Sequence, residues 1–275
     1  MEDILNVNQT NTIHAGVDYN RREHVEREEE LYVNPSNLWR IAECPASARK
    51  ICRMASSVGK MGRFGLTVDH IVASAILKGT SPREVGAGAS ESIIKQAEVY
   101  YGFLMAIMRK HPGSVLRVEH MMQGDWIPNF CGIADAVLYI PQRKELFIID
   151  HKTGTNARYK PADFQLQAYA CMAYDELTAE GYDIQKVALL IYQPELIEQP
   201  TRGRVFTEPD TIDRWHEKIA GIVAYARDHL AEANPDCYRC LLCPHARSCP
   251  ALRQYDTDNG GKFRLYRERM QRRFN

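Results

Sequence analysis

Residues 131–154, CGIADAVLYIPQRKELFIIDHKTG, decide the fold because they contain two apolar runs on either side of a short polar break. Residues 131–140 and 145–152 have the length and the content of Val, Ile and aromatic residues that are typical of β-strands. The break PQRK is short enough to be a hairpin loop. With all four of its residues in the loop, Ile140 pairs with Glu145 and the two strands form an antiparallel ladder.

This ladder predicts a group of charged side chains on one surface. Counting back from the turn places Asp135 opposite Asp150, and the two-residue period of a strand puts Lys152 on the same face as Asp150. Two carboxylates that close repel each other, and a divalent cation resolves the conflict. Mg²⁺ and Mn²⁺ prefer carboxylate oxygens, and either ion would polarise a phosphate and help to form the attacking hydroxide. Glu119, on the preceding predicted strand, is a candidate for a further ligand.

A structural ion pair is the alternative interpretation of these charges. Two features favour a functional site instead. Asp150 and Lys152 end a strongly apolar run, where solvation is poor, and Gly154 gives the chain a sharp exit beside them. Gln165 and Tyr169 follow at i and i+4 on one face of a predicted helix. We therefore expect Lys152 to steady the nucleophile and the developing charge, and the candidate catalytic residues are Asp135, Asp150, Lys152, Gln165 and Tyr169.

The remaining apolar pattern predicts a mixed α/β domain. Helices come first, an antiparallel meander follows, and a helix, a strand and a helix come last, which favours a mixed central sheet flanked by helices. One expected helix starts at Ser36, and four others cover about residues 65–79, 90–110, 161–180 and 209–231. The other expected strands cover residues 114–123 and 186–194.

Length and composition limit the function classes. The 275 residues, 45% of them apolar, suit one elaborated domain or a domain with a small appendage. No run of about 18 apolar residues occurs, which argues against a membrane span. The N-terminal segment MEDILNVNQTNT lacks the charged-then-apolar pattern of a secretory leader. We therefore expect a cytoplasmic protein with reduced thiols.

Charge is balanced overall but unevenly placed. The formal net charge of zero removes the argument for nucleic acid that a strongly basic protein would offer. Residues 1–30 are acidic, whereas residues 251–275 contain Lys262 and six arginines against three acidic residues. This basic segment is a candidate to lie along a phosphate backbone, and the alternatives are a solvated helix face or a loose tail.

Four of the eight cysteines crowd into residues 237–249, CYRCLLCPHARSC. In a reduced compartment such crowding indicates a metal ion or an iron–sulfur cluster rather than disulfides. The local set of Cys237, Cys240, Cys243 and Cys249 would suit tetrahedral Zn²⁺. The isolated cysteines are expected to be small buried apolar residues, and these are Cys52, Cys131 and Cys171.

Three segments in this order resemble the RecB-type branch of the PD-(D/E)XK nuclease superfamily, which includes CRISPR-associated and phage-encoded exonucleases with iron–sulfur clusters. Residues 132–135, GIAD, match the pattern G-x-x-D; residues 150–154, DHKTG, match D-x-K-T-G; and residues 165–170, QLQAYA, match Q-L-x-x-Y-A. The resemblance covers roughly residues 34–250. It implies a restriction-endonuclease-like mixed central sheet flanked by helices, with the active site at a notch in the sheet.

The resemblance also implies further ligands. The family places a metal-binding histidine on an early helix after a glycine, and GLTVDH supplies His70. Glu119 fits the acidic position before the hairpin. Iron–sulfur members use one early cysteine and three late ones spaced C-x₂-C-x₅-C, which here implies a [4Fe–4S] cluster held by Cys44, Cys240, Cys243 and Cys249. Cys237 departs from this pattern and stays an alternative ligand, as Zn²⁺ stays an alternative occupant.

The expected function is that of a Mg²⁺- or Mn²⁺-dependent DNA nuclease. The resemblance implies an exonuclease on single-stranded DNA or duplex ends, active in recombination, repair or phage DNA metabolism in a bacterial or phage-infected cell. A second copy, or a recombination or replication protein, is a further candidate partner. The alternative functions are a non-catalytic DNA-binding or scaffold protein with the same fold, and a redox protein that leaves the aspartates and the lysine unused. The expected organisation is an acidic arm (1–33), a nuclease core (34–232), a cysteine region joined by Cys44 (233–250) and a basic tail (251–275).

Overall fold

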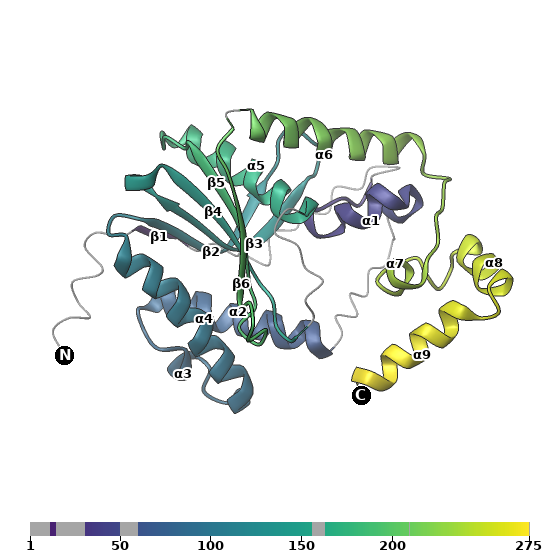
Figure 1. Ribbon diagram of the computed structural model, residues 1–275, viewed down its shortest axis with the longest axis horizontal. Helices are drawn as coiled ribbons and strands as arrows, with labels where there is room; N and C mark the ends of the chain where they lie inside the picture. Colours follow the sequence, from purple (N-terminus) through teal and green to yellow (C-terminus); the bar gives the residue numbers. More distant parts are fainter. Residues whose placement is uncertain (1–11, 15–30, 50–59, 156–162, 209, 275) are drawn as a thin grey trace.

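The computed structural model describes residues 12–14, 31–49, 60–155, 163–208 and 210–274 (Figure 1). A six-stranded sheet in the order β1-β2-β3-β4-β5-β6 forms the centre of the molecule. Strands β2, β3 and β4 form an antiparallel meander, β1 and β5 run parallel to their neighbours β2 and β4, and β6 is antiparallel to β5. The strands are β1 (Thr12–His14), β2 (Val115–Gln123), β3 (Cys131–Ile140), β4 (Glu145–His151), β5 (Lys186–Tyr192) and β6 (Thr201–Phe206).

Helices cover both faces of this sheet, so the predicted mixed sheet flanked by helices is confirmed (Figure 1). On one face, Val137 and Ile148 join a core with α1, α5 and α6. On the other face, Leu138 and Ile149 join a core with α2 and α4. The helices are α1 (Leu38–Glu43), α2 (Lys60–Lys78), α3 (Pro82–Val85), α4 (Glu91–Lys110), α5 (Phe164–Ala179), α6 (Thr211–Asp228), α7 (Cys237–Leu241), α8 (Pro250–Asp258) and α9 (Lys262–Phe274), with 3₁₀ turns η2 (Pro35–Asn37), η3 (Pro45–Ala48) and η4 (Pro141–Arg143). No helix in the described ranges is long and apolar enough to cross a membrane.

The hairpin has the predicted register. Ile140 pairs with Glu145, and the ladder continues to the pair of Ala136 with Ile149. Pro141 begins the turn η4, and Lys144 ends it in the left-handed region at φ 49°. This turn keeps the loop at the length that sets the two aspartates opposite each other.

Several elements differ from the expectations. Strand β1 has only three residues, and β6 is mostly exposed, so neither has the apolar alternation that predicts a strand. The basic segment forms the helices α8 and α9 rather than a loose tail. Cys171 is buried as expected, but Cys131 is exposed at the start of β3, and Cys52 lies outside the described residues. Residues 1–11 and 15–30 of the expected acidic arm also lie outside them.

The last three helices pack around a small core of their own, made of Cys240, Leu252 and Phe263. Contacts with α1 join this region to the rest of the protein. Nη1 of Arg40 donates to the carbonyl of Leu242 at 3.1 Å, although the two residues lie 202 positions apart. The ring centroids of Trp39 and Tyr238 are 5.7 Å apart, and Arg239 Nη2 lies 3.6 Å from Glu43 Oε2.

Substitution of Gly132 by alanine tests how tightly the sheet, η2 and α5 are packed. A Cβ atom there would lie 2.9 Å from Cγ and Cδ of Pro35 and from Cε1 of Tyr169. We expect Gly132→Ala to lower the free energy of unfolding by about 1–3 kcal/mol, the usual cost of overpacking. Gly221 on α6 has open space around its Cα, so Gly221→Ala is the matched control and should raise it by about 1 kcal/mol. Chemical denaturation measures both, and equal effects would contradict the packing argument.

Candidate active site

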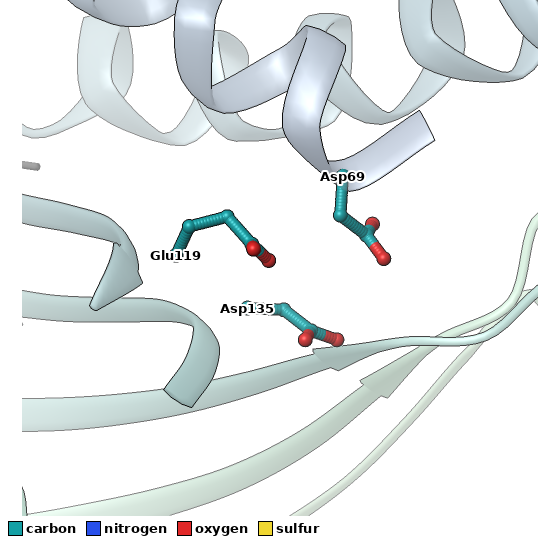
Figure 2. Close-up of side chains that lie close together, drawn as sticks. All are labelled: Asp69, Glu119 and Asp135. Atoms are coloured by element: carbon teal, nitrogen blue, oxygen red, sulfur yellow. The ribbon is translucent and has the colours of Figure 1, made fainter. Parts of the chain in front are cut away.

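Three carboxylates from three different elements meet beside His151, the last residue of β4. Asp69 comes from α2, Glu119 from β2 and Asp135 from β3. One oxygen of each lies within 4.8 Å of an oxygen of the other two. Figure 2 shows the Asp69 side chain reaching down from the helix, with its carboxylate directed towards those of Glu119 and Asp135. This is the one group of three or more metal-ligating side chains at that spacing in the described part of the chain.

The backbone changes conformation where these strand residues lie. The register of β2 and β3 puts Glu119 opposite Asp135, but Glu119 has a left-handed backbone with φ 46°. On either side of Asp135, Ala134 packs in the core under α5, whereas Ala136 packs in the core under α2 and α4. The side-chain alternation of the sheet is therefore broken at this pair. A left-handed glutamate costs roughly 1–3 kcal/mol, and such strain is common where a side chain is aimed at a functional site.

The helix α2 supplies an aspartate rather than the histidine that was expected. Val68 and Val72 are buried against the sheet, and Asp69 lies at the border of that buried side. His70 points the other way and is exposed, like Leu66 one helical turn earlier. An α-helix turns about 100° per residue, so neighbours in sequence face different directions. The structure therefore does not bring His70 into the cluster, and the apolar period of α2 is the signal that would have selected Asp69.

Beside the carboxylate cluster, Asp150 forms an ion pair with Lys152. Oδ1 of Asp150 accepts from Nζ of Lys152 at 2.6 Å and from Nε2 of Gln165 at 3.2 Å. Asp150 is only 3% exposed. The carboxylate of Asp135 reaches the same place, because its Oδ2 accepts from the backbone N–H of His151 at 2.7 Å. The structure thus brings together the charged residues predicted from the hairpin.

Two further contacts hold the chain after β4 and the start of α5. Gly154 has a left-handed backbone with φ 83°, and its carbonyl accepts from Nε2 of Gln193 at 2.6 Å. Asp163 caps α5, because its Oδ1 accepts from the backbone N–H of Leu166 at 3.1 Å. The cap fixes the start of the helix that carries Gln165, so the amide meets Asp150 at a defined position.

Tyr169 lies one turn further along α5 and is buried. Burial raises the pKa of Tyr169, and the nearby carboxylates of Asp135 and Asp150 raise it further, so the phenol is neutral at physiological pH. Its ring packs against Gly132, where no side chain would fit. Tyr169 thereby combines a packing role with a hydroxyl group placed near the acidic residues.

His151 is a member of the site that the sequence did not indicate. It lies between Asp150 and Lys152 in the chain but faces the opposite side of β4, where its ring stacks on Tyr100 at 4.3 Å between centroids. A hydrogen bond of 2.6 Å joins its Nδ1 to Oδ1 of Asp69. Burial lowers the pKa of His151 to about 4. A neutral, buried ring therefore holds the Asp69 carboxylate in place.

The cluster is electrostatically unfavourable by itself. Burial raises the pKa of Asp135 well above its usual range, the carboxylates of Asp69 and Asp150 raise it further, and Lys152 lowers it. Burial also raises the pKa of Asp69. A divalent cation between the oxygens would remove the repulsion that these shifts express, and oxygen donors are the ligands that Mg²⁺ and Mn²⁺ prefer. The donor set therefore fits such an ion.

A second cluster is built from cysteines. Cys44, at the end of α1, accepts from the backbone N–H of Asn234 through its Sγ at 3.3 Å, which places it against the segment that leads to the late cysteines. Burial raises the pKa of Cys240 to about 11 and also raises that of Cys243, with Cys44 adding to both effects. Cys237 instead has its sulfur 3.8 Å from the hydroxyl of Tyr255.

Arg40 brings a positive charge to this second cluster. The side chain is buried, and its Nε has no hydrogen-bond partner among the described atoms. Its charge acts on Cys243 and Cys44. Metal coordination deprotonates a thiol outright, and a buried guanidinium stabilises the negative charge that results. The cysteines could therefore hold a thiolate-bound metal ion or cluster, and Arg40 would balance part of its negative charge.

Comparison with known proteins defines the class. A sequence model described as the PD-(D/E)XK nuclease superfamily matches residues 68–250, and the chain belongs to this superfamily. No curated protein matches the chain as a whole at a significant level.

Solved structures with a related arrangement include SSO0001, which is 17% identical at a TM-score of 0.40 and covers 84% of this chain and 90% of its own. An alkaline exonuclease from Laribacter hongkongensis is 12% identical at a TM-score of 0.35, with 73% of this chain and 90% of that chain covered. A phage-related exonuclease from Haemophilus somnus 129PT is 15% identical at a TM-score of 0.30, with 73% and 95% covered.

Paired substitutions on α2 distinguish the two candidate ligands. Loss of a residue that only supports a metal ligand weakens metal binding roughly 10- to 100-fold. We expect Asp69→Asn to weaken Mn²⁺ binding by at least that factor, because Asp69 lies among the carboxylates. His70→Ala should leave the affinity unchanged, because His70 is exposed. Titration calorimetry with Mn²⁺ gives both affinities. A loss of affinity in the histidine variant alone would restore the ligand inferred from the sequence.

Proposed function

We propose that this protein hydrolyses phosphodiester bonds of DNA with the help of a divalent cation. The observation that carries the proposal is the meeting of Asp69, Glu119 and Asp135 next to the ion pair of Asp150 and Lys152. A phosphodiester is an anion, and three carboxylates would repel it unless a cation lay between them. The same place holds an ammonium group, which is the charge needed beside a reacting phosphate.

Asp69, Glu119 and Asp135 would hold the cation, with Asp150 as a neighbouring carboxylate that can join them. Bound there, Mg²⁺ or Mn²⁺ would withdraw charge from the phosphate and lower the pKa of a water molecule. His151 keeps the Asp69 carboxylate directed at the cluster through its 2.6 Å hydrogen bond.

Lys152 acts on the reacting groups directly. Its three N–H donors can orient a water molecule and balance the negative charge that builds up on the phosphoryl oxygens. Asp150, 2.6 Å away, holds the ammonium group in position. Gln165 fixes the orientation of that carboxylate from α5, and the neutral hydroxyl of Tyr169 is available to position the strand.

The substrate that we propose is the end of a DNA strand, either single-stranded or at a duplex terminus. The resemblance of the residue pattern to exonucleases supports this choice. An enzyme of this kind needs a free end, so it should digest linear single-stranded DNA and leave a covalently closed circle of the same sequence intact. Cleavage of the circle at a comparable rate would make the protein an endonuclease.

Single substitutions test the catalytic assignment. We expect Asp150→Ala and Lys152→Ala to slow the digestion of end-labelled DNA by at least about 100-fold, because the second removes the ammonium group and the first removes the carboxylate that positions it. Lys186→Ala, at the exposed start of β5, removes a similar charge elsewhere and should keep the native rate. EDTA should stop the reaction, and circular dichroism should show that all variants fold. A native rate in either site variant under Mn²⁺ would refute the assignment.

For the second site we propose a [4Fe–4S] cluster on Cys44, Cys240, Cys243 and Cys249. The late spacing C-x₂-C-x₅-C supports this choice. The charges of Cys44, Cys240 and Cys243 act on one another, and that of Cys249 acts on Cys243, so the four residues share one region. The contact of Cys237 with Tyr255 supports its exclusion from the ligand set.

Purification without oxygen tests the cluster. We expect a brown protein with visible absorption and about four iron and four sulfide per chain. Cys243→Ser should lose most of this absorption because it removes a ligand. Cys237→Ser should keep it, which makes it the matched control. A colourless protein with stoichiometric zinc, or equal losses in both variants, would contradict the proposed ligand set.

A further inference from the structure

The C-terminal helix α9 has a basic solvent-facing surface that the proposed chemistry does not use. Over residues 262–270 it carries one acidic residue, Glu268, and four cations that are all exposed. These are Lys262, Arg264, Arg267 and Arg269. Two more arginines follow in the sequence before its end. The helix buries only a narrow stripe that begins at Phe263, so most of its surface is available to a partner.

The charge of α9 is not neutralised within the described residues. None of its four exposed cations forms an ion pair with another described side chain. Other surface arginines do: Arg83 pairs with Glu91 and Glu98. Arg264 and Arg267 are spaced i, i+3, where like charges destabilise a helix. An anionic partner along this surface would relieve that repulsion.

The position of α9 is nevertheless well defined. Gly260 and Gly261 both have left-handed backbones, at φ 62° and 79°, and form the turn after α8. Oδ1 of Asp256 accepts from the backbone N–H groups of Phe263 and Arg264 at 2.7 and 3.1 Å and so caps the first turn. Phe263 is buried in the small core that contains Cys240. The cysteine region therefore holds the basic helix in place, on the right of the view in Figure 1.

We propose that α9 binds the sugar–phosphate backbone of DNA and that the cysteine region holds this helix in position for the contact. The inference deepens the proposed function and rests on it, since it names how the substrate is held outside the active site. A helix of 13 residues is about 20 Å long, which equals the rise of about six phosphates along one strand. Exposed guanidinium groups bind phosphate oxygens without regard to base sequence, so the helix retains the strand while ends are processed.

Equilibrium binding in EDTA tests the inference without cleavage. The variant Arg264→Gln/Arg267→Gln/Arg269→Gln removes three charges from α9. The matched control, Lys78→Gln/Arg109→Gln/Lys110→Gln, removes three exposed charges from the ends of α2 and α4. Fluorescence anisotropy with labelled DNA at a series of KCl concentrations gives the slope of log K against log [salt]. We expect the α9 variant to lose about 0.7–0.9 of slope for each phosphate contact removed, and the control to keep the native slope.

A second variant tests whether the cysteine region supports α9. Phe263→Ala leaves every cation of α9 present but removes the side chain that anchors the helix in the core with Cys240. We expect a weaker affinity for DNA, with the active-site rate on a short saturating substrate unchanged. An affinity for DNA equal to that of the native protein would overturn the proposed role of the cysteine region in supporting α9.

The outcomes separate this inference from the proposed function. A native protein that neither binds nor cuts DNA would refute the proposed function. Native cleavage together with an unchanged salt slope in the α9 variant would refute the inference alone. Binding of the native protein, but not of the α9 variant, to phosphatidylserine vesicles, with equal DNA affinity for both, would assign the helix to a membrane surface and overturn the DNA assignment.

Discussion

Repulsion between the carboxylates beside the end of β4 is the constraint on which the rest of the site depends. Asp69, Glu119 and Asp135 come from three separate elements, and their oxygens lie within 4.8 Å of one another. Burial adds to this cost, since a charged carboxylate loses water without gaining a counter-ion. Lys152 offsets part of the charge beside Asp150, and a hard divalent cation of the kind proposed above would offset the remainder. Packing of the surrounding helices and strands opposes this repulsion, together with the hydrogen bonds that Asp69, Asp135 and Asp150 accept from their neighbours.

The packing that opposes the repulsion is visible in particular contacts. The core under α2 and α4 fixes the helix that carries Asp69, and His151, stacked on Tyr100, holds the carboxylate by a hydrogen bond. On the other face, α5 packs against Gly132 through Tyr169 and carries the amide that meets Asp150. Asp69 and Asp150 thus each have a neighbour whose position is set by apolar contacts. Such packing would keep the carboxylates in place for the cation that we propose.

Much of this arrangement is encoded locally and was predictable. A four-residue turn and a two-residue period suffice to place Asp135 opposite Asp150 and to put Lys152 beside it. The observed ladder has the predicted register from Ile140 with Glu145 to Ala136 with Ile149, and Lys152 Nζ lies 2.6 Å from Asp150. The apolar period of α2 predicts that Asp69 faces the sheet and that His70 does not. The glycine–histidine spacing of the family pattern had instead predicted His70 as the ligand. The left-handed backbone of Glu119 was not predictable, because it depends on how two cores meet across the sheet. The strand β6 is mostly exposed, and it pairs with the edge of β5 and packs one ring, Phe206, against Trp215.

The contact of Arg40 with Leu242 has a consequence for how the chain is made. The two residues are 202 positions apart, so the guanidinium reaches its buried position only after Leu242 has left the ribosome. Contacts of such long sequence separation form late, because loop closure must precede them. The hairpin and the helices of the nuclease fold can associate while the cysteine segment is still being translated. The buried position of Arg40 can therefore form only after the strands that carry Asp135 and Asp150 have been synthesised.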